Sequence, residues 1–188
     1  GRPVGWDVAG VVDRPPSGVG RLSEGTRVAG FVKAADGWAE RVAVPASELA
    51  PIPEAVADLQ AACLPVAGLT ALYALERGDR LLESRVLVTG ATGGVGLFAV
   101  RLADLMGART VAQVRREEQR ELVLAEGAVE AAVDPDGGSL ADLGAYRLVV
   151  DGLGGSVLEG ALSGLAPDGR AVVYGATADD SARLDVPA

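Results

Sequence analysis

Arg85-Val-Leu-Val-Thr-Gly-Ala-Thr-Gly-Gly-Val-Gly-Leu-Phe-Ala-Val-Arg-Leu-Ala103 is the stretch of this chain that says most about its fold. It begins with an apolar run that predicts a buried strand and ends with residues of helical periodicity. Between the two, Gly90, Gly93 and Gly96 allow a tight turn, a close approach of backbone to ligand, and close packing of helix on strand. A strand, a glycine turn and a helix in this order predict a binding site for the pyrophosphate of a dinucleotide.

The start of the helix supplies the groups that would hold the phosphates. The first N–H groups of a helix have no intrahelical partner and carry a partial positive charge, and here they belong to Gly94, Val95 and Gly96. Thr92 adds a hydroxyl and a backbone N–H that can donate to a phosphate oxygen. The alternative is that the glycines and Thr92 form an ordinary turn without a ligand.

Composition excludes several kinds of function. The chain has 188 residues, of which 49% are hydrophobic, so it predicts a globular protein with a sizeable core. Its formal charge of −9 argues against nucleic acid as a partner, because like charges repel. The chain has no histidine, which excludes a Ser-His-Asp triad or a His-ligated metal within it. With one cysteine, Cys63, it has no internal disulfide, and we predict no metal site.

Cys63 lies in an apolar run over residues 59–75. This run contains Pro65 and Gly68 and is slightly short of a membrane span, so we interpret it as buried core, with Cys63 as a buried structural thiol. No secretory leader is visible, and we predict a cytoplasmic protein without membrane association. Both ends look cut, which predicts a piece of a longer enzyme lacking both ends; a naturally short two-domain protein is the alternative.

The chain divides into three segments by its hydrophobic pattern. Residues 1–52 predict part of a small β domain, with strands at 6–12, 26–32 and 38–44. Residues 53–82 predict connecting helices at 54–64 and 66–77, separated by the proline ring of Pro65. From residue 83 to 188 strands and helices alternate, which predicts an α/β domain with a doubly wound parallel sheet.

Glycine and proline residues mark the boundaries of the expected strands and helices in this third segment. Gly107 and Gly127 stand where left-handed caps end two helices, and Pro167-Asp168-Gly169 predicts a turn into the last strand. We expect strands at 85–89, 109–114, 129–133, 146–151 and 170–174, and helices at 95–106, 117–126 and 156–165.

The end of the second strand of such a sheet selects the cofactor. An acidic residue there binds the ribose hydroxyls of NAD, whereas arginine accepts the 2′-phosphate of NADP. Arg115 and Arg116 occupy this place, and no carboxylate ends the strand, so we predict NADPH. The alternative is a solvated pair balanced by Glu117 and Glu118, with Glu118 able to act as the ribose acceptor.

Further candidates follow the later strands. Gly175 follows the last strand, at a carboxyl end where ligands collect, so its backbone is expected to approach the nicotinamide half of the cofactor. Asp151, after the preceding strand, is as suited to capping a turn as to contacting a ligand. Thr70 faces either the core or the cofactor, and the pattern leaves both open.

Six motifs together carry a resemblance that the glycine turn alone does not. The chain resembles the medium-chain dehydrogenase/reductase superfamily, and within it the zinc-independent, zeta-crystallin-like quinone oxidoreductase group. Besides the turn at 90–96, the carrying segments are Gly5-Trp-Asp-Val-Ala-Gly-Val-Val12, Gly25-Thr-Arg-Val-Ala-Gly30, Gly37-Trp-Ala-Glu-Arg-Val-Ala-Val-Pro45, Ala62-Cys-Leu-Pro-Val-Ala-Gly-Leu-Thr-Ala71 and Leu165-Ala-Pro-Asp-Gly-Arg-Ala-Val-Val-Tyr-Gly175.

The resemblance implies a GroES-like catalytic domain, here only its later part, and a Rossmann domain that binds NADPH. Zinc-dependent relatives carry Gly-His-Glu where this chain has Gly5-Trp6-Asp7, so the resemblance predicts no zinc. A family lysine that helps to hold the 2′-phosphate matches Gln119, and a family tyrosine near the cofactor matches Asp134; both are departures. Thr70 matches a family threonine near the nicotinamide.

The resemblance also implies an activity. It predicts hydride transfer from NADPH to a small-molecule quinone or α,β-unsaturated carbonyl (enone) substrate, with a homodimer as the full-length state. The oxyanion donors of the family come from the upstream part of the catalytic domain, so we assign no catalytic residue. The alternatives are an enoyl-thioester reductase and a non-catalytic NADPH-binding protein with a crystallin-like or regulatory role.

Overall fold

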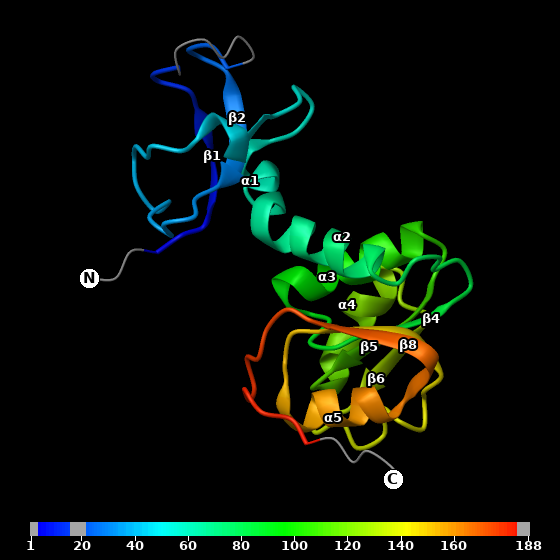
Figure 1. Cartoon of the computed structure of the whole chain (residues 1–188). Coiled ribbons are helices and arrows are strands. Elements are labelled where there is room, and N and C mark those ends of the chain that lie inside the picture. Colours follow the sequence, from blue (N-terminus) through cyan, green and yellow to red (C-terminus); the bar gives the residue numbers. More distant parts are fainter. Residues whose placement is uncertain (1–3, 16–21, 184–188) are drawn as a thin grey trace. The chain divides into compact units, whose positions relative to one another are not determined.

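The computed structural model describes residues 4–15 and 22–183, which belong to two compact units, Gly1–Leu69 and Thr70–Ala188 (Figure 1). The boundary falls within the expected connecting helices. The first and last residues of the expected domains, 1–3 and 184–188, lie outside the described residues. The expected limits at 1–52, 53–82 and 83–188 stay a prediction, since a compact unit is not by itself a functional domain.

The first unit contains a three-stranded antiparallel sheet in the order β1-β2-β3. Its elements are β1 Asp7–Val11, β2 Arg27–Phe31, the 3₁₀ turn η1 Ala46–Glu48 and β3 Leu49–Pro51. The first two strands confirm the sequence prediction. The strand predicted at 38–44 is wrong: a strand needs a ladder partner, and no described strand pairs with these residues. The third strand is the short β3 instead.

The helical run that follows differs from prediction at Pro65. It consists of α1 Asp58–Ala61, the π-helical turn η2 Leu64–Gly68 and α2 Leu69–Glu76. Pro65 lies in the first turn of η2. A helix start leaves its N–H groups without intrahelical partners, so a proline there costs no hydrogen bond. The two expected helices are therefore joined through a π turn, and Pro65 does not separate them.

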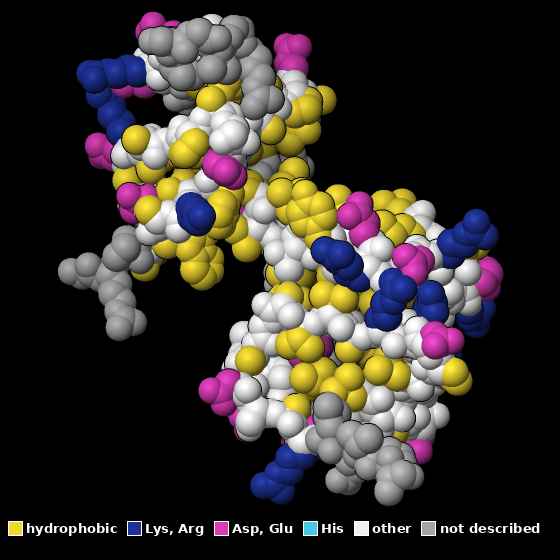
Figure 2. Space-filling model, viewed as in Figure 1, with side chains coloured by type: hydrophobic (Ala, Val, Ile, Leu, Met, Phe, Trp, Pro, Cys, Tyr) yellow, Lys and Arg dark blue, Asp and Glu magenta, His cyan; other side chains and the backbone are white. Residues whose placement is uncertain are grey.

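This run is less buried than the sequence suggests. Asp58–Glu76 is long and apolar enough to cross a membrane by length and composition alone, with a mean hydropathy of 1.3, and 28% of that window is buried. Figure 2 shows hydrophobic side chains at the surface along it, and Leu59 is 85% exposed. Cys63 is also exposed, with its thiol directed to the Leu59 carbonyl oxygen at 3.3 Å. The expected buried thiol is wrong, because an apolar neighbourhood in sequence does not fix which side of a helix faces the core.

The second unit is a five-stranded parallel sheet in the order β6-β5-β4-β7-β8. This confirms the predicted doubly wound α/β class. The chain leaves the central strand β4, builds one half outward through β5 and β6, and returns to β7 on the other side of β4. The strands are β4 Arg85–Val88, β5 Arg109–Val114, β6 Glu130–Val133, β7 Tyr146–Asp151 and β8 Leu165–Val173.

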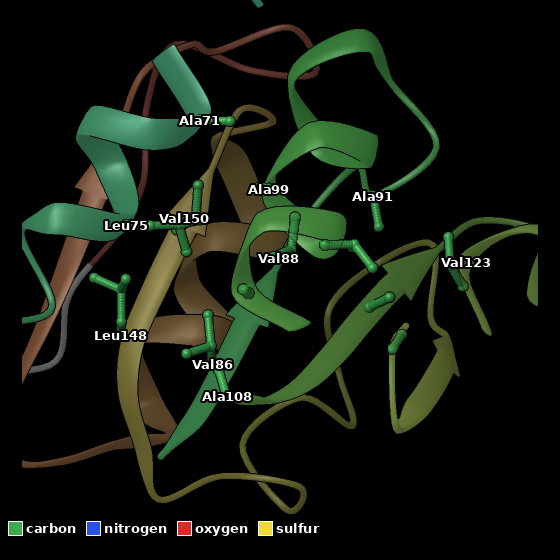
Figure 3. Close-up of a cluster of buried hydrophobic side chains, with 14 of the residues drawn as sticks. Ala71, Leu75, Val86, Val88, Ala91, Ala99, Ala108, Val123, Leu148 and Val150 are labelled. Atoms are coloured by element: carbon green, nitrogen blue, oxygen red, sulfur yellow. The ribbon is translucent and has the colours of Figure 1, made fainter. Parts of the chain in front are cut away.

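Helices cover both faces of this sheet (Figure 1). On one face, side chains of α2, α3 Gly94–Leu105 and α4 Arg120–Ala125 form one buried cluster together with Val86, Val88 and Val150 of the sheet (Figure 3). On the other face, α5 Gly155–Ser163 packs on Leu87 and Val149. Alternate residues of β4 thus point to opposite cores, which explains why its sequence is apolar at every position of Val86–Val88.

Two boundaries in this unit differ most from prediction. The helix expected at 117–126 begins as a 3₁₀ turn, η3 Glu117–Gln119, before α4. The last strand starts earlier than expected, at Leu165, and the expected turn is an irregularity within it, where Asp168 has φ +60°. Gly107 and Gly127 have φ +74° and +107°, which confirms their predicted left-handed caps.

Candidate functional site

The glycine turn lies between the end of β4 and the start of α3, as the sequence predicts. Gly90 has φ +55°, a conformation that favours glycine. Gly96 packs against the turn so closely that an added Cβ would lie 2.8 Å from the Cα of Ala91. The turn therefore brings the first residues of α3, including Gly94 and Val95, directly after the carboxyl end of the central strand.

One buried side chain ties this turn to the neighbouring strands. Gln113, near the end of β5, is fully buried. Its Oε1 accepts the Gly90 N–H at 2.8 Å, and its Nε2 donates to the Asp134 carbonyl oxygen at 2.6 Å. This role of Gln113 was not predicted from the sequence. The available signal was a single amide within the buried run of residues 111–114, because such a group requires polar partners.

A cavity of about 460 Å³ opens where the strands end. Residues that follow all five strands of the second unit line it, one after each strand: Gly90, Arg115, Pro135, Leu153 and Thr177. In parallel sheets this edge is where ligands bind, and the volume lies within the usual range for small-molecule sites. No carboxylate is among the described residues that line this cavity.

The structure brings only some of the predicted site residues to this cavity. Gly90, Thr92, Gly93 and Arg115 line it. Thr70, half-buried on α2, and Gly175 do not line it, and nothing in the structure tests their expected contacts with the nicotinamide half. For all of these residues, the binding role remains a prediction.

The two arginines after β5 have different surroundings. Arg115 lines the cavity and has no ion pair with any described residue. Arg116 is paired with the Glu118 carboxylate, with 2.9 Å from Nε to Oε1, and both side chains are about two-thirds exposed. Such a surface pair contributes little stability, but it directs Glu118 to Arg116.

Gln119 connects these arginines to the glycine turn. Its Oε1 accepts the backbone N–H groups of Arg115 and Arg116, each at 3.1 Å. Its Nε2 donates to the Thr92 hydroxyl at 3.2 Å. From the sequence, Gln119 was only a departure from a family lysine, because a contact between residues 27 positions apart is not visible in the local pattern.

The buried carboxylates near the strand ends are already bonded. Asp151 accepts hydrogen bonds from the Thr89 hydroxyl at 2.5 Å and the Gly154 N–H at 3.0 Å, which is the turn-capping arrangement. Asp134 accepts from the Gly137 N–H and from both the N–H and hydroxyl of Ser139. Burial alone would raise the pKa of Asp134, but the hydrogen bonds from Ser139 and Gly137 outweigh it and lower that pKa below its ordinary value.

Tyr174 lies beside the same strand ends, packed over Gly152. Burial, and secondarily the Asp151 carboxylate, raises the pKa of Tyr174 to about 12. Its phenol therefore stays protonated at neutral pH.

The residues present do not suit a zinc ion. The chain has no histidine and one cysteine, and no three ligating side chains gather anywhere in residues 4–15 and 22–183. Asp7, at the motif that differs from zinc-dependent relatives, instead accepts the Val66 N–H at 2.7 Å within the first unit. Its carboxylate supports the helical run.

Several known proteins are similar to this chain in sequence. A family model described as zinc-binding dehydrogenase matches residues 94–188. A "Quinone oxidoreductase-like protein 2" of Bos taurus is 34% identical over 180 residues, covering 91% of this chain and 51% of that protein. A "Mycocerosic acid synthase-like polyketide synthase" of Mycobacterium tuberculosis is 38% identical over 122 residues, covering 64% of this chain and 6% of that protein.

Two solved structures extend the similarity to the fold. The quinone oxidoreductase of Pseudomonas syringae has a TM-score of 0.84 and 28% identity, covering 92% of this chain and 55% of its own. The quinone oxidoreductase of Thermus thermophilus, solved also as an NADPH complex, has a TM-score of 0.75 and 39% identity, covering 89% and 53%. The chain spans about half the length of these quinone oxidoreductase relatives. These matches confirm the resemblance found in the sequence: the chain belongs to the zinc-binding dehydrogenase family, in the quinone oxidoreductase-like group of the medium-chain dehydrogenase/reductase superfamily.

Proposed function

We propose that this chain forms the cofactor-binding part of an NADPH-dependent oxidoreductase that reduces a quinone or an α,β-unsaturated carbonyl compound. The observation that carries the proposal is the cavity at the strand ends. It combines the glycine turn, the Thr92 hydroxyl and the guanidinium of Arg115, without a carboxylate in its described lining. In a chain with a formal charge of −9, a site of this composition favours an anionic ligand.

Different residues of the chain would bind different parts of the cofactor. The N–H groups at the start of α3 and the Thr92 hydroxyl would hold the diphosphate, and Arg115 would hold the 2′-phosphate. Val114, Pro135 and Leu153 give the cavity apolar walls that suit the adenine ring. The bound cofactor supplies the hydride, so the remaining task of the protein is to orient it and exclude water.

The comparisons support a nicotinamide cofactor. Solved structures of the Thermus thermophilus quinone oxidoreductase, of Escherichia coli YhdH and of mycobacterial Rv1454c are described with NADPH. Their quinone oxidoreductase members also support a small-molecule substrate. A homodimer of the full-length protein, implied by the family resemblance, and a cytoplasmic location, suggested by the single cysteine, complete the proposal.

A second candidate function is the reduction of an enoyl thioester within a larger synthase. It is favoured by the match to the polyketide synthase of Mycobacterium tuberculosis and by the CurK enoyl reductase, which has a TM-score of 0.83 and 26% identity. The substrate separates the two candidates. Turnover of crotonyl thioesters without turnover of quinones would favour the second.

The test of the cofactor assignment uses Arg115→Ala with Arg116→Ala as its matched control. We expect the unchanged chain to bind NADPH at least about tenfold more tightly than NADH, equivalent to about 1.4 kcal/mol, as followed by the fluorescence of the reduced nicotinamide. Arg115→Ala is expected to remove this preference. Arg116→Ala should retain most of it, because Arg116 is engaged by Glu118. Equal affinities of the unchanged chain for both cofactors would refute the role of Arg115.

A further inference from the structure

Gln119 joins two separate parts of the cavity wall. Its Oε1 accepts two backbone N–H groups of the loop that follows β5, and its Nε2 reaches the hydroxyl of Thr92 in the glycine turn. Both Thr92 and Gln119 line the cavity, as does Arg115 of the same loop. One side-chain amide therefore fixes the distance between the turn and the loop.

The chemistry of these contacts fixes the orientation of the amide. Two N–H donors point at one atom of Gln119, so that atom is the carbonyl oxygen and the NH₂ group faces Thr92. An NH₂ group only donates, so the Thr92 hydroxyl oxygen must accept. The hydroxyl keeps its own proton, and no acceptor among the described residues takes that proton.

We propose that Gln119 is a positioning residue that presets Thr92 as a hydrogen-bond donor to a phosphate oxygen of the dinucleotide. The same amide holds the backbone from which Arg115 extends. The inference rests on the proposed cofactor function. In this role a neutral side chain orients the Thr92 hydroxyl before the cofactor binds.

The competing explanation is that Gln119 only caps the turn η3. Gln60 makes the same kind of bond at α1, where its Oε1 accepts the Ala57 N–H at 3.1 Å, and it does not line the cavity. A capping role alone predicts a loss of stability without a loss of cofactor affinity. Gln60→Glu is therefore the matched control, and it should leave cofactor binding unchanged.

The first variant is Gln119→Glu. Its carboxylate can still accept both backbone N–H groups, so the turn keeps its cap. It cannot donate to Thr92, and it takes the hydroxyl proton instead. We expect an unchanged thermal midpoint and an affinity for NADPH at least about tenfold lower, which is the scale of one hydrogen bond to a charged acceptor.

The added charge of the glutamate would also weaken binding, and Thr92→Val separates the two effects. In the unchanged chain Thr92→Val should lower affinity about tenfold, and Thr92→Ser should retain it. In the Gln119→Glu background Thr92→Val should have little further effect, because the hydroxyl proton is already engaged. An equal effect of Thr92→Val in both backgrounds would overturn the proposal.

The affinities of the unchanged chain distinguish failure of this inference from failure of the proposed function. If it binds neither NADPH nor NADH, both proposals fail. If it binds NADPH and Gln119→Glu binds equally well, Gln119 is only a cap and the cofactor assignment stands. If the effect of Thr92→Val does depend on Gln119, the two cofactors show which phosphate Thr92 contacts. A loss of affinity for both NADPH and NADH assigns the Thr92 hydrogen bond to the diphosphate. A loss for NADPH alone assigns it to the 2′-phosphate.

Discussion

Gln113 is a fully buried polar side chain beside the cavity, and the free-energy cost of burying its amide is offset because both ends of the amide are hydrogen-bonded. It holds the Gly90 N–H on one side and the Asp134 carbonyl oxygen on the other. Removing the amide would leave both backbone groups without these partners. An unpaired buried polar group costs more than the hydrogen bond itself contributes.

We therefore expect Gln113→Met to lower the free energy of unfolding by about 2–4 kcal/mol. NADPH affinity should fall as well, because the glycine turn loses its tie to β5. Urea denaturation followed by circular dichroism checks the first effect, and a cofactor titration checks the second. Gln60→Met, at an exposed amide, serves as the control: it should leave NADPH affinity unchanged and cost less stability, because it removes one exposed capping bond.

Asp134 gives the chain a pH-dependent contribution to stability. Its pKa is lower in the folded than in the unfolded state, so its contribution is present above the unfolded value, near pH 4, and is lost as the pH falls through the folded value. Asp134→Asn should cost about 1–3 kcal/mol at pH 7, since one amide oxygen cannot replace the acceptors used by Gly137 and Ser139. The difference between variant and parent should narrow below pH 4. Urea unfolding measures the free energies of unfolding of the variant and the unchanged chain. A constant difference between them from pH 7 to pH 3.5 would contradict this prediction.

At the scale of elements, α3 and the glycine turn pack at van der Waals contact. Gly96→Ala places a Cβ against Ala91 and the Gly90 carbonyl, both of which are backbone and cannot move aside without shifting the turn. We expect a loss of about 1–3 kcal/mol of stability and weaker cofactor binding.

Gly138→Ala is the matched control for this change. An added Cβ at Gly138 meets no atom within 4 Å, so it should be tolerated. The two variants can be compared by thermal denaturation and by NADPH titration. Equal thermal midpoints of the two variants would show that stability does not depend on the close approach of α3 to the turn.

The same elements show what the sequence could predict. Four of the five strands of the parallel sheet were predicted to within one residue, because each contains a buried apolar run, whereas β8 starts at Leu165, five residues before its predicted start. The strand at 38–44 was not, because alternation does not reveal whether a partner strand is present. Gln113 and Gln119 were missed as site residues for a related reason: their partners lie 23 and 27 positions away.

At the scale of the whole molecule, the chain consists of two units with separate buried residues. Leu22, Val28 and Val32 are buried in the first unit, whereas both large hydrophobic clusters belong to the second. Trp6 and Trp38, the only tryptophans of the chain, lie in the first unit. Tryptophan emission therefore reports on the first unit, and far-ultraviolet circular dichroism chiefly on the helices of the second.

We expect these two signals to change at different urea concentrations, because multi-domain chains depart from two-state unfolding. NADP⁺ should shift only the transition seen by circular dichroism. At an NADP⁺ concentration 100 times its dissociation constant, the free energy of unfolding of the second unit should rise by about 2.7 kcal/mol. Coincident transitions that both move with cofactor would contradict this prediction. They would mean that the two units unfold as one.

The exposed Cys63 has a practical consequence for studies of this protein. It is the one thiol of the chain, it stands on the helical run of the first unit, and its side chain is exposed among the described residues. A maleimide dye would therefore attach at a single known position without any prior substitution. Paired with the fluorescence of bound NADPH as the energy donor, that dye would record in solution how far the first unit lies from the cofactor.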